Sequence, residues 1–289
     1  MFPLARPSSE SPRFVGPTMS GWFARLRRQR LALAVVAPPA PVTPPVHPVP
    51  MAMRLAAWRD GAPLPLAPME LVHTLINQRR VQFCVNIADD PIQNAHRKGR
   101  FYEARELAQV CAHLQPGAVV LDVGANTGNH ALWFALHASA SRVVVVEPNP
   151  LALEPLVGNV LGNRLQDVID LTFIGFGLGE ADSDGWGMKK HDRNLGATKM
   201  FPGKGELTVR RGDSVFADLV PDLIKIDVEG MEMAVLSGLS DLIARCRPRI
   251  MIEVMDTNAA AFADWVKAQN YRAETLGHEP KLTNYLLHP

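Results

Sequence analysis

Two acidic residues stand where a bound nucleoside could be held. Asp122 lies in an apolar, β-branched run and is followed by the spacing G-x-x-x-G, made by Gly124 and Gly128. Glu147 ends the next apolar run of this kind. Glycine lets a ligand approach the backbone closely, and a carboxylate at a strand tip can accept hydrogen bonds from ribose hydroxyls. The pattern predicts a nucleoside-binding site at two neighbouring strand ends.

Two classes of cofactor fit such a site. A dinucleotide usually binds at G-x-G-x-x-G, where glycines pack against a pyrophosphate, and Asp122 would repel that group. The same carboxylate can hydrogen-bond the ammonium group of S-adenosyl-L-methionine, directly or through water. The charge therefore favours S-adenosylmethionine and a methyltransferase. The alternative for Gly124 and Gly128 is a tight turn between a strand and a helix, with no ligand.

Three further residues complete the predicted cofactor site. Asn126 lies inside the glycine turn, and Asn149 follows Glu147. Phe176 ends a predicted strand over 169–176. In Rossmann-like methyltransferase folds, the loop after this strand often passes the adenine ring. Core packing is the alternative for Phe176.

The second charged pattern is the segment KIDVEG. Lys225 and Asp227 share one face of a predicted strand, because side chains alternate along a strand. Charges in a central strand are costly unless they are paired or functional. One interpretation is a local ion pair, with Glu229 orienting the next helix. The other places Asp227 and Glu229 beside an acceptor alcohol, which must lose its proton as it attacks; Asp227 would then also border the cofactor.

His191 and Glu253 are the other candidate bases. His191 lies in the segment HDRNLGA, where a solvated side chain is the alternative, and Glu253 could instead cap a helix or loop. Asp227, Glu229 and Glu253 could form an oxygen-rich magnesium-type site. Their spacing alone does not support one, so we predict no metal.

The elements that must position these residues alternate between helix and strand from about Met69 onward. Helical spacing predicts helices over 102–114, 129–137 and 151–161, near 235–242 and near 262–266. Apolar runs predict strands over 119–123, 142–146, 169–176, 223–227 and 250–254, closed by two antiparallel strands over 271–275 and 282–287. This alternation implies an α/β fold with a doubly wound, mostly parallel, Rossmann-like sheet and helices on both faces. Residues 177–212, rich in glycine and charge, are predicted to form a loop or β-hairpin excursion.

The first part of the chain has a different composition. Of the 24 prolines, 14 fall within residues 1–68, and proline cannot join a helix interior or a central strand. We therefore predict a disordered segment over 1–68 and a methyltransferase domain over 69–289. Four arginines between Arg25 and Arg30 precede a short apolar run, an order that mimics a secretory signal. We expect a solvated or weakly membrane-touching tail rather than a true signal peptide, and a true start at Met51 or Met53 is the alternative.

Charge and cysteine content exclude several classes of protein. The formal net charge is +1, which gives no reason to expect a nucleic-acid partner. Three separated cysteines do not suggest a disulfide scaffold or a structural zinc site. No apolar run reaches the ~20 residues of a transmembrane helix. We expect a cytoplasmic protein, with peripheral membrane contact through the basic N-terminal segment as the alternative.

The sequence resembles the FkbM family of methyltransferases. The resemblance covers roughly residues 80–254 and is most specific in the KIDVEG segment with its following helix. The segments that carry it are 102–103, 120–130 (VLDVGANTGNH), 146–149 (VEPN), 222–239 (DLIKIDVEGMEMAVLSGL) and 247–253 (RPRIMIE).

The resemblance implies a Rossmann-like domain and S-adenosylmethionine as the methyl donor. It also implies transfer to a hydroxyl, often in polyketide, glycan or lipid pathways. We therefore expect methylation of an oxygen on a sugar, lipid or polyketide-type acceptor. The alternatives are a nicotinamide-dependent oxidoreductase and a non-catalytic, methyltransferase-like binding module.

Overall fold

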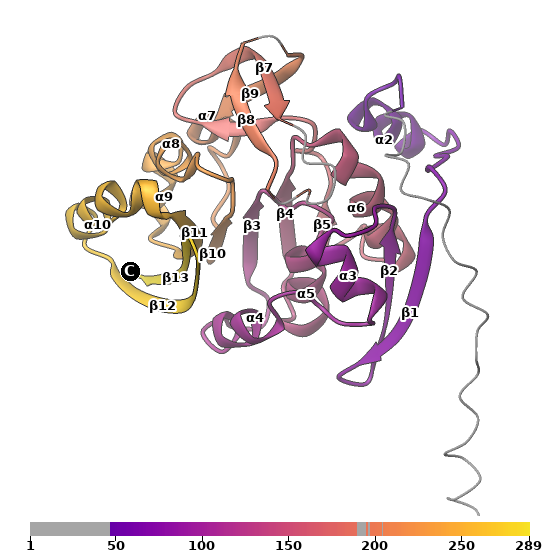
Figure 1. Cartoon of the computed structure of the whole chain (residues 1–289), viewed down its shortest axis with the longest axis horizontal. Helices are drawn as coiled ribbons and strands as arrows, with labels where there is room; N and C mark the ends of the chain where they lie inside the picture. Colours follow the sequence, from indigo (N-terminus) through magenta and orange to yellow (C-terminus); the bar gives the residue numbers. More distant parts are fainter. Residues whose placement is uncertain (1–46, 190–194, 196, 204) are drawn as a thin grey trace, which may run out of the picture. The chain divides into compact units, whose positions relative to one another are not determined.

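The computed structural model describes residues 47–189, 195, 197–203 and 205–289. All of these residues belong to one compact unit, Pro41–Pro289. Its main sheet has seven strands in the order β12-β13-β11-β10-β3-β4-β5 (Figure 1). Their bounds are β3 Val119–Val123, β4 Arg142–Val146, β5 Ile169–Asp170, β10 Leu223–Ile226, β11 Arg249–Met255, β12 Arg272–Glu279 and β13 Leu282–His288.

The five neighbouring strands from β11 to β5 run parallel, and β13 is antiparallel to both of its neighbours. The predicted fold class is confirmed. Apolar residues alternate between two cores, because side chains alternate along a strand. Val143 and Val145 of β4 belong to one buried cluster, and Val144 and Val146 belong to the other. Helices therefore cover both faces of the sheet, and the carboxyl ends of β10, β3 and β4 meet at one edge.

The helices follow the predicted order. Residues 129–137 form a helix with the bounds expected from the sequence, whereas the helix predicted near 235–242 is two short helices. The bounds are α4 Ala104–Cys111, α5 Asn129–His137, α6 Pro150–Gly162, α8 Glu232–Gly238, α9 Ser240–Cys246 and α10 Ala259–Ala268, with the 3-10 turn η1 Asp256–Asn258 before α10.

The prediction of a third strand over 169–176 is mostly wrong. Only Ile169 and Asp170 pair with β4, followed by an isolated bridge between Glu147 and Ile174. The chain turns between them, because Asp170 Oδ1 accepts a hydrogen bond from Thr172 N at 3.0 Å.

The excursion over 177–212 forms a second sheet of four strands in the order β6-β9-β7-β8. Figure 1 shows β7, β8 and β9 beyond the ends of β3 and β4. The excursion was predicted, but a four-stranded sheet with one parallel pair, β6 and β9, was not. Its elements are β6 Gly177–Gly179, β7 Ser183–Lys189, β8 Lys199–Pro202, β9 Leu207–Arg211 and α7 Gly212–Val215.

The structure differs from the domain boundary expected at Met69. Helix α2, Met51–Arg59, buries Met51 and Leu55 in the same core cluster as β3 and β4. Arg54 pairs with Glu154 of α6 at 2.6 Å. The chain then forms a hairpin of β1 (Glu70–Ile76) and β2 (Arg79–Val85), followed by α3 (Pro91–Arg97). We therefore propose that the folded domain begins near residue 50.

Replacing Leu55 by alanine tests this boundary. Leu55 is 1% exposed, so the cavity should lower the free energy of unfolding by about 2–5 kcal/mol. Met53 lies on the same helix and is 63% exposed, so Met53→Ala is the matched control. Urea unfolding measures both. Equal stability of the two variants would restore the boundary at Met69.

No helix in the described part of the chain is long and apolar enough to cross a membrane.

Candidate functional site

A pocket opens at the carboxyl ends of β3, β4 and β10. One side is formed by the loops after β3 and β4, with Gly124, Asn126, Glu147 and Asn149. The KIDVEG segment lines the pocket from β10 onward. The excursion closes it with Leu178, Met188, Leu195, Thr198 and Met200. This is the strand edge at which ligands bind in doubly wound folds.

Glu147 is fixed between the two loops. Its Oε2 accepts a hydrogen bond from Asn126 N at 2.7 Å, and its Oε1 accepts one from Asn149 N at 2.7 Å. Burial raises the pKa of this carboxyl to about 7, although both hydrogen bonds favour the charged form. Each oxygen keeps a lone pair that can accept a hydrogen bond from a hydroxyl group of a ligand. Asn149 is also the N-cap of α6, where its Oδ1 accepts from Leu151 N at 3.1 Å.

The glycine turn is shaped by a close approach of two backbone segments. Gly124 has φ +78°, and a Cβ there would lie 1.8 Å from the Asp227 carbonyl oxygen. Gly128 has φ +84°, and a Cβ there would meet the Leu156 side chain at 2.7 Å. Both glycines are therefore needed by the fold itself. Asn126, between them, adopts φ +50°.

Asp122 lies beneath the pocket. Its side chain is 0% exposed, and Lys225 Nζ lies 3.2 Å from its Oδ1. Apart from this ion pair, its oxygens have no hydrogen-bond partner among the described residues. Lys225 also lies 3.4 Å from Asp227 and donates to the Gly124 carbonyl at 2.7 Å. The ion pair expected within KIDVEG is thus present, but Lys225 joins two carboxylates and the glycine turn.

Three carboxyl groups gather beside the pocket. The closest oxygens of Asp227, Glu229 and Glu253 all lie within 4.8 Å of one another. Burial and the neighbouring carboxylates raise the pKa of Glu229 to about 7 and that of Glu253 to about 9. At neutral pH the cluster therefore retains protons, and Lys225 balances part of its charge.

Glu229 has an unusual backbone conformation, with φ +51°. A residue other than glycine in this region carries strain, which is often found at functional sites. The turn before α8 is held by a different residue, since Gly230 N donates to Glu232 Oε1 at 2.6 Å. Glu229 is therefore not the residue that orients this helix, and its side chain lines the pocket.

Glu103 extends the carboxyl cluster from a part of the chain for which the sequence predicted no role in catalysis. His130 Nε2 lies 3.0 Å from its Oε2. Burial opposes the charged form of Glu103, but the contacts with His130 and Lys225 outweigh it and lower the pKa of this carboxyl. Asn129 positions the segment: its Oδ1 accepts from Tyr102 N at 2.9 Å, and its amide donates to Tyr102 O at 3.0 Å. The only sequence signal was the pair Tyr102–Glu103 in the family resemblance.

One expected residue is not among those that line the pocket, and another is not described. Phe176 packs against the core cluster that contains Leu121 and Val123 of β3, and the pocket wall is made by Leu178. His191 lies outside the described residues. Leu195, four positions later, is described: it is 4% exposed, and its N–H donates to Asp90 Oδ2 at 2.8 Å. Asp90 also caps α3 by accepting from Gln93 N at 2.8 Å, so α3 anchors this wall.

The pocket fits S-adenosylmethionine. Asn126 Oδ1 is buried at the pocket and has no hydrogen-bond partner within the described chain. A buried polar atom of this kind is costly unless a ligand or water satisfies it. The Glu147 carboxylate lies beside it, and apolar side chains such as Leu178 supply a wall for an aromatic base.

Residues 122–273, more than half of the chain, match the methyltransferase FkbM domain. The chain belongs to the FkbM methyltransferase family. Its domain is therefore an S-adenosylmethionine-dependent methyltransferase domain with S-adenosylmethionine as cofactor, and the nicotinamide alternative is set aside. The predicted family resemblance is confirmed.

The chain is also similar to individual proteins at low sequence identity. The chain is 30% identical to the AMB antimetabolite synthetase AmbE of Pseudomonas aeruginosa, over 52% of this chain and 9% of that protein. A crystal structure of methyltransferase FkbM from Methylobacillus flagellatus is 20% identical, with a TM-score of 0.46, over 61% of this chain and 45% of that one. TrmK of M. capricolum, solved with S-adenosylhomocysteine, is 12% identical, with a TM-score of 0.39, over 65% and 68%. The chain thus spans under half of the first two relatives.

Gly124→Ala should destabilise the FkbM domain and weaken cofactor binding, because the added Cβ would clash with the Asp227 carbonyl oxygen. Gly117 is a matched control: it has φ +87°, but a Cβ added there would have nothing within 4 Å, whereas one at Gly124 would meet backbone. Both variants carry conformational strain, and only Gly124→Ala adds overpacking, worth about 1–3 kcal/mol. Thermal unfolding and S-adenosylhomocysteine calorimetry measure the difference. Equal loss in both variants would mean that the close approach has no consequence.

Proposed function

We propose that this protein methylates a hydroxyl oxygen of a small sugar, lipid or polyketide-type acceptor. The observation that carries the proposal is the cluster of Asp227, Glu229 and Glu253 beside the cofactor pocket. Carboxylates accept hydrogen bonds from hydroxyl groups, and a neutral alcohol needs a base as it attacks.

The donor side of the proposed site is formed by Glu147 and the two loops that it joins. Glu147 would accept the ribose hydroxyls, while Asn126 and Asn149 border the same wall. Gly124 and Gly128 keep the backbone open there. Bound S-adenosylmethionine supplies a methyl group on a sulfonium, an electrophile with an excellent leaving group. Asp122 would support the donor site indirectly. It pairs with Lys225, and Lys225 in turn donates a hydrogen bond to the Gly124 carbonyl in the glycine turn.

The acceptor side would be formed by Asp227 and Glu229. With a pKa near 7, Glu229 is suited to take a proton at neutral pH, since a general base works best when its pKa is near the working pH. Asp227 borders both the pocket and the Lys225 ammonium, so it would orient the acceptor hydroxyl. Glu253, protonated below about pH 9, can donate a hydrogen bond to a second acceptor oxygen. His191 stays a candidate base.

The first experiment is calorimetry with S-adenosylmethionine and S-adenosylhomocysteine, with NAD as the control ligand. Binding of the adenosyl compounds alone supports the donor site, and Glu147→Gln should weaken it. Hydroxylated acceptors are then screened by S-adenosylhomocysteine release, with and without magnesium, because the three carboxyl groups are close enough to share a cation. Donor binding followed by methylation only at nitrogen would overturn the hydroxyl proposal. No donor binding by folded protein would favour the non-catalytic module.

A further inference from the structure

A second group of potential ligands lies at the opposite edge of the sheet. His113 follows α4, Glu274 belongs to β12 and His288 ends β13. Ile250 at the start of β11 pairs with Leu287, so the end of β13 lies at the amino ends of the parallel strands. The group is therefore separate from the cofactor pocket, which opens at their carboxyl ends.

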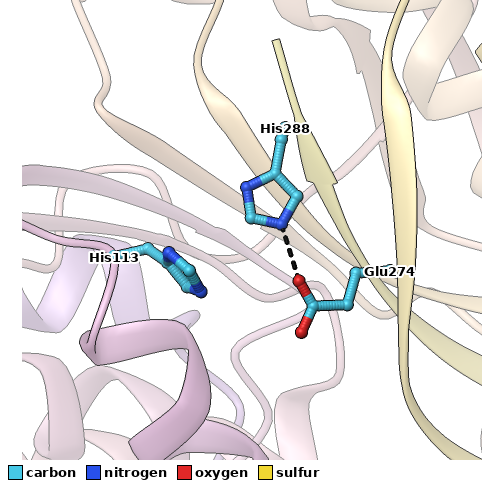
Figure 2. A group of neighbouring side chains, drawn as sticks. All are labelled: His113, Glu274 and His288. Carbon is cyan, nitrogen blue, oxygen red and sulfur yellow. Dashed lines mark hydrogen bonds and ion pairs between the residues drawn. The ribbon is translucent and has the colours of Figure 1, made fainter.

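The three side chains converge from separate parts of the chain. Figure 2 shows His113 approaching from the α4 side and Glu274 and His288 from the hairpin. One ligand atom from each lies within 4.8 Å of the other two. His288 Nε2 lies 2.9 Å from Glu274 Oε2, and the two histidine rings meet edge to face at 5.0 Å. The side chains of His288 and Glu274 are 12% and 39% exposed, so the group is partly covered and still open to an ion from solvent.

We propose that His113, Glu274 and His288 bind a zinc-type divalent cation. Two imidazoles and one carboxylate are a donor set that zinc accepts, with a fourth position left for water. Zinc holds nitrogen and oxygen ligands at about 2.0–2.2 Å in a tetrahedron. Ligand atoms on one ion are then a little over 3 Å apart, so small side-chain adjustments convert the present spacing into coordination.

The alternative is an ion pair between a charged His288 and Glu274. That pair uses only Glu274 and His288, and His113 then contributes only its edge-to-face ring contact with His288. A cation would use all three side chains. It would tie the connection after α4 to the closing hairpin, β12–β13. Such a tie stabilises the folded state in proportion to occupancy, because the unfolded chain lacks the assembled site.

The test uses the full chain, prepared without a polyhistidine tag and stripped of metal with a chelator. Zinc binding is measured by calorimetry and by competition with a chromogenic chelator, and thermal unfolding is followed with and without zinc. The variants are His113→Ala, His288→Ala and Glu274→Gln. His278→Ala is the matched control, because His278 lies on the same hairpin and bonds Thr283 instead. Binding of S-adenosylhomocysteine checks that each variant is folded.

The expected result is one zinc ion per chain and a higher unfolding midpoint with zinc, both kept in His278→Ala. Loss of an outer-shell partner alone costs about 10- to 100-fold in metal affinity, so loss of a ligand should cost at least as much. Zinc-edge X-ray absorption should show two imidazole ligands. The proposal is overturned if the wild-type chain binds no zinc, or if folded His113→Ala and His288→Ala variants keep the wild-type affinity.

Discussion

Replacing Glu229 by glutamine should lower turnover on a hydroxyl acceptor by about 10²–10⁴-fold, the usual contribution of a general base. Glutamine keeps the shape of the side chain but cannot take a proton. S-adenosylhomocysteine affinity should stay near that of the wild type, because the proposed donor contacts belong to Glu147 and the loops beside it. Single-turnover kinetics with an acceptor from the screen separate the two effects. If Glu229→Gln and the wild type turn over equally fast, Glu229 is not the base, and Asp227, Glu253 and His191 are the remaining candidates.

The pH profile adds a second readout for Glu229. A base with a pKa near 7 is protonated below that pH, so activity should rise as the pH passes through 7. Deprotonation of Glu253 near pH 9 adds a negative charge to the cluster and should lower activity again. Asp227 raises both pKa values. In Asp227→Asn the rising limb should therefore move to lower pH, and a limb that stays in place would contradict the assignment.

Replacing Lys225 by methionine should give the largest loss of stability. Lys225 is 2% exposed, Asp122 beside it is 0% exposed, and the ammonium also neighbours Asp227. Removing one partner of a buried pair leaves an uncompensated charge and costs about 3–5 kcal/mol. The loss should appear in urea unfolding as a lower midpoint with an unchanged slope.

Two comparisons identify the cause of that loss. Lys267 is exposed on α10, so Lys267→Met should change the stability by less than about 0.5 kcal/mol. Adding Asp122→Asn to Lys225→Met removes the uncompensated charge and should restore part of the stability. If the double variant is no more stable than the single one, the loss comes from packing of the lysine stem.

The sheet and one half of the site followed from local sequence. Apolar, β-branched runs identified the central strands, and the alternation of strands with helices identified a parallel sheet. Parallel strands present their carboxyl ends at one edge, so Glu147 and Asp227 could be placed near each other without a structure. The structure places β10 beside β3, on the other side from β4.

The rest depends on contacts between distant segments. Glu103 reaches the cluster because Asn129 bonds both backbone groups of Tyr102, and no local pattern encodes that contact. Helix α2 joins the core although prolines surround it, because burial of Leu55 outweighs the composition of its neighbours. The group of His113, Glu274 and His288 has no motif at all, since its members are brought together by the closing hairpin.

The junction of Gly124 with Asp227 has a consequence for how the domain can evolve. The two halves of the pocket touch through backbone atoms: the Asp227 carbonyl lies where a Cβ of residue 124 would be, and the Gly124 carbonyl accepts from Lys225. Backbone contacts do not depend on the side chains farther along the loops. Mutations in the excursion can therefore change the side chains that line the pocket while the loops after β3 and β10 keep their position relative to each other.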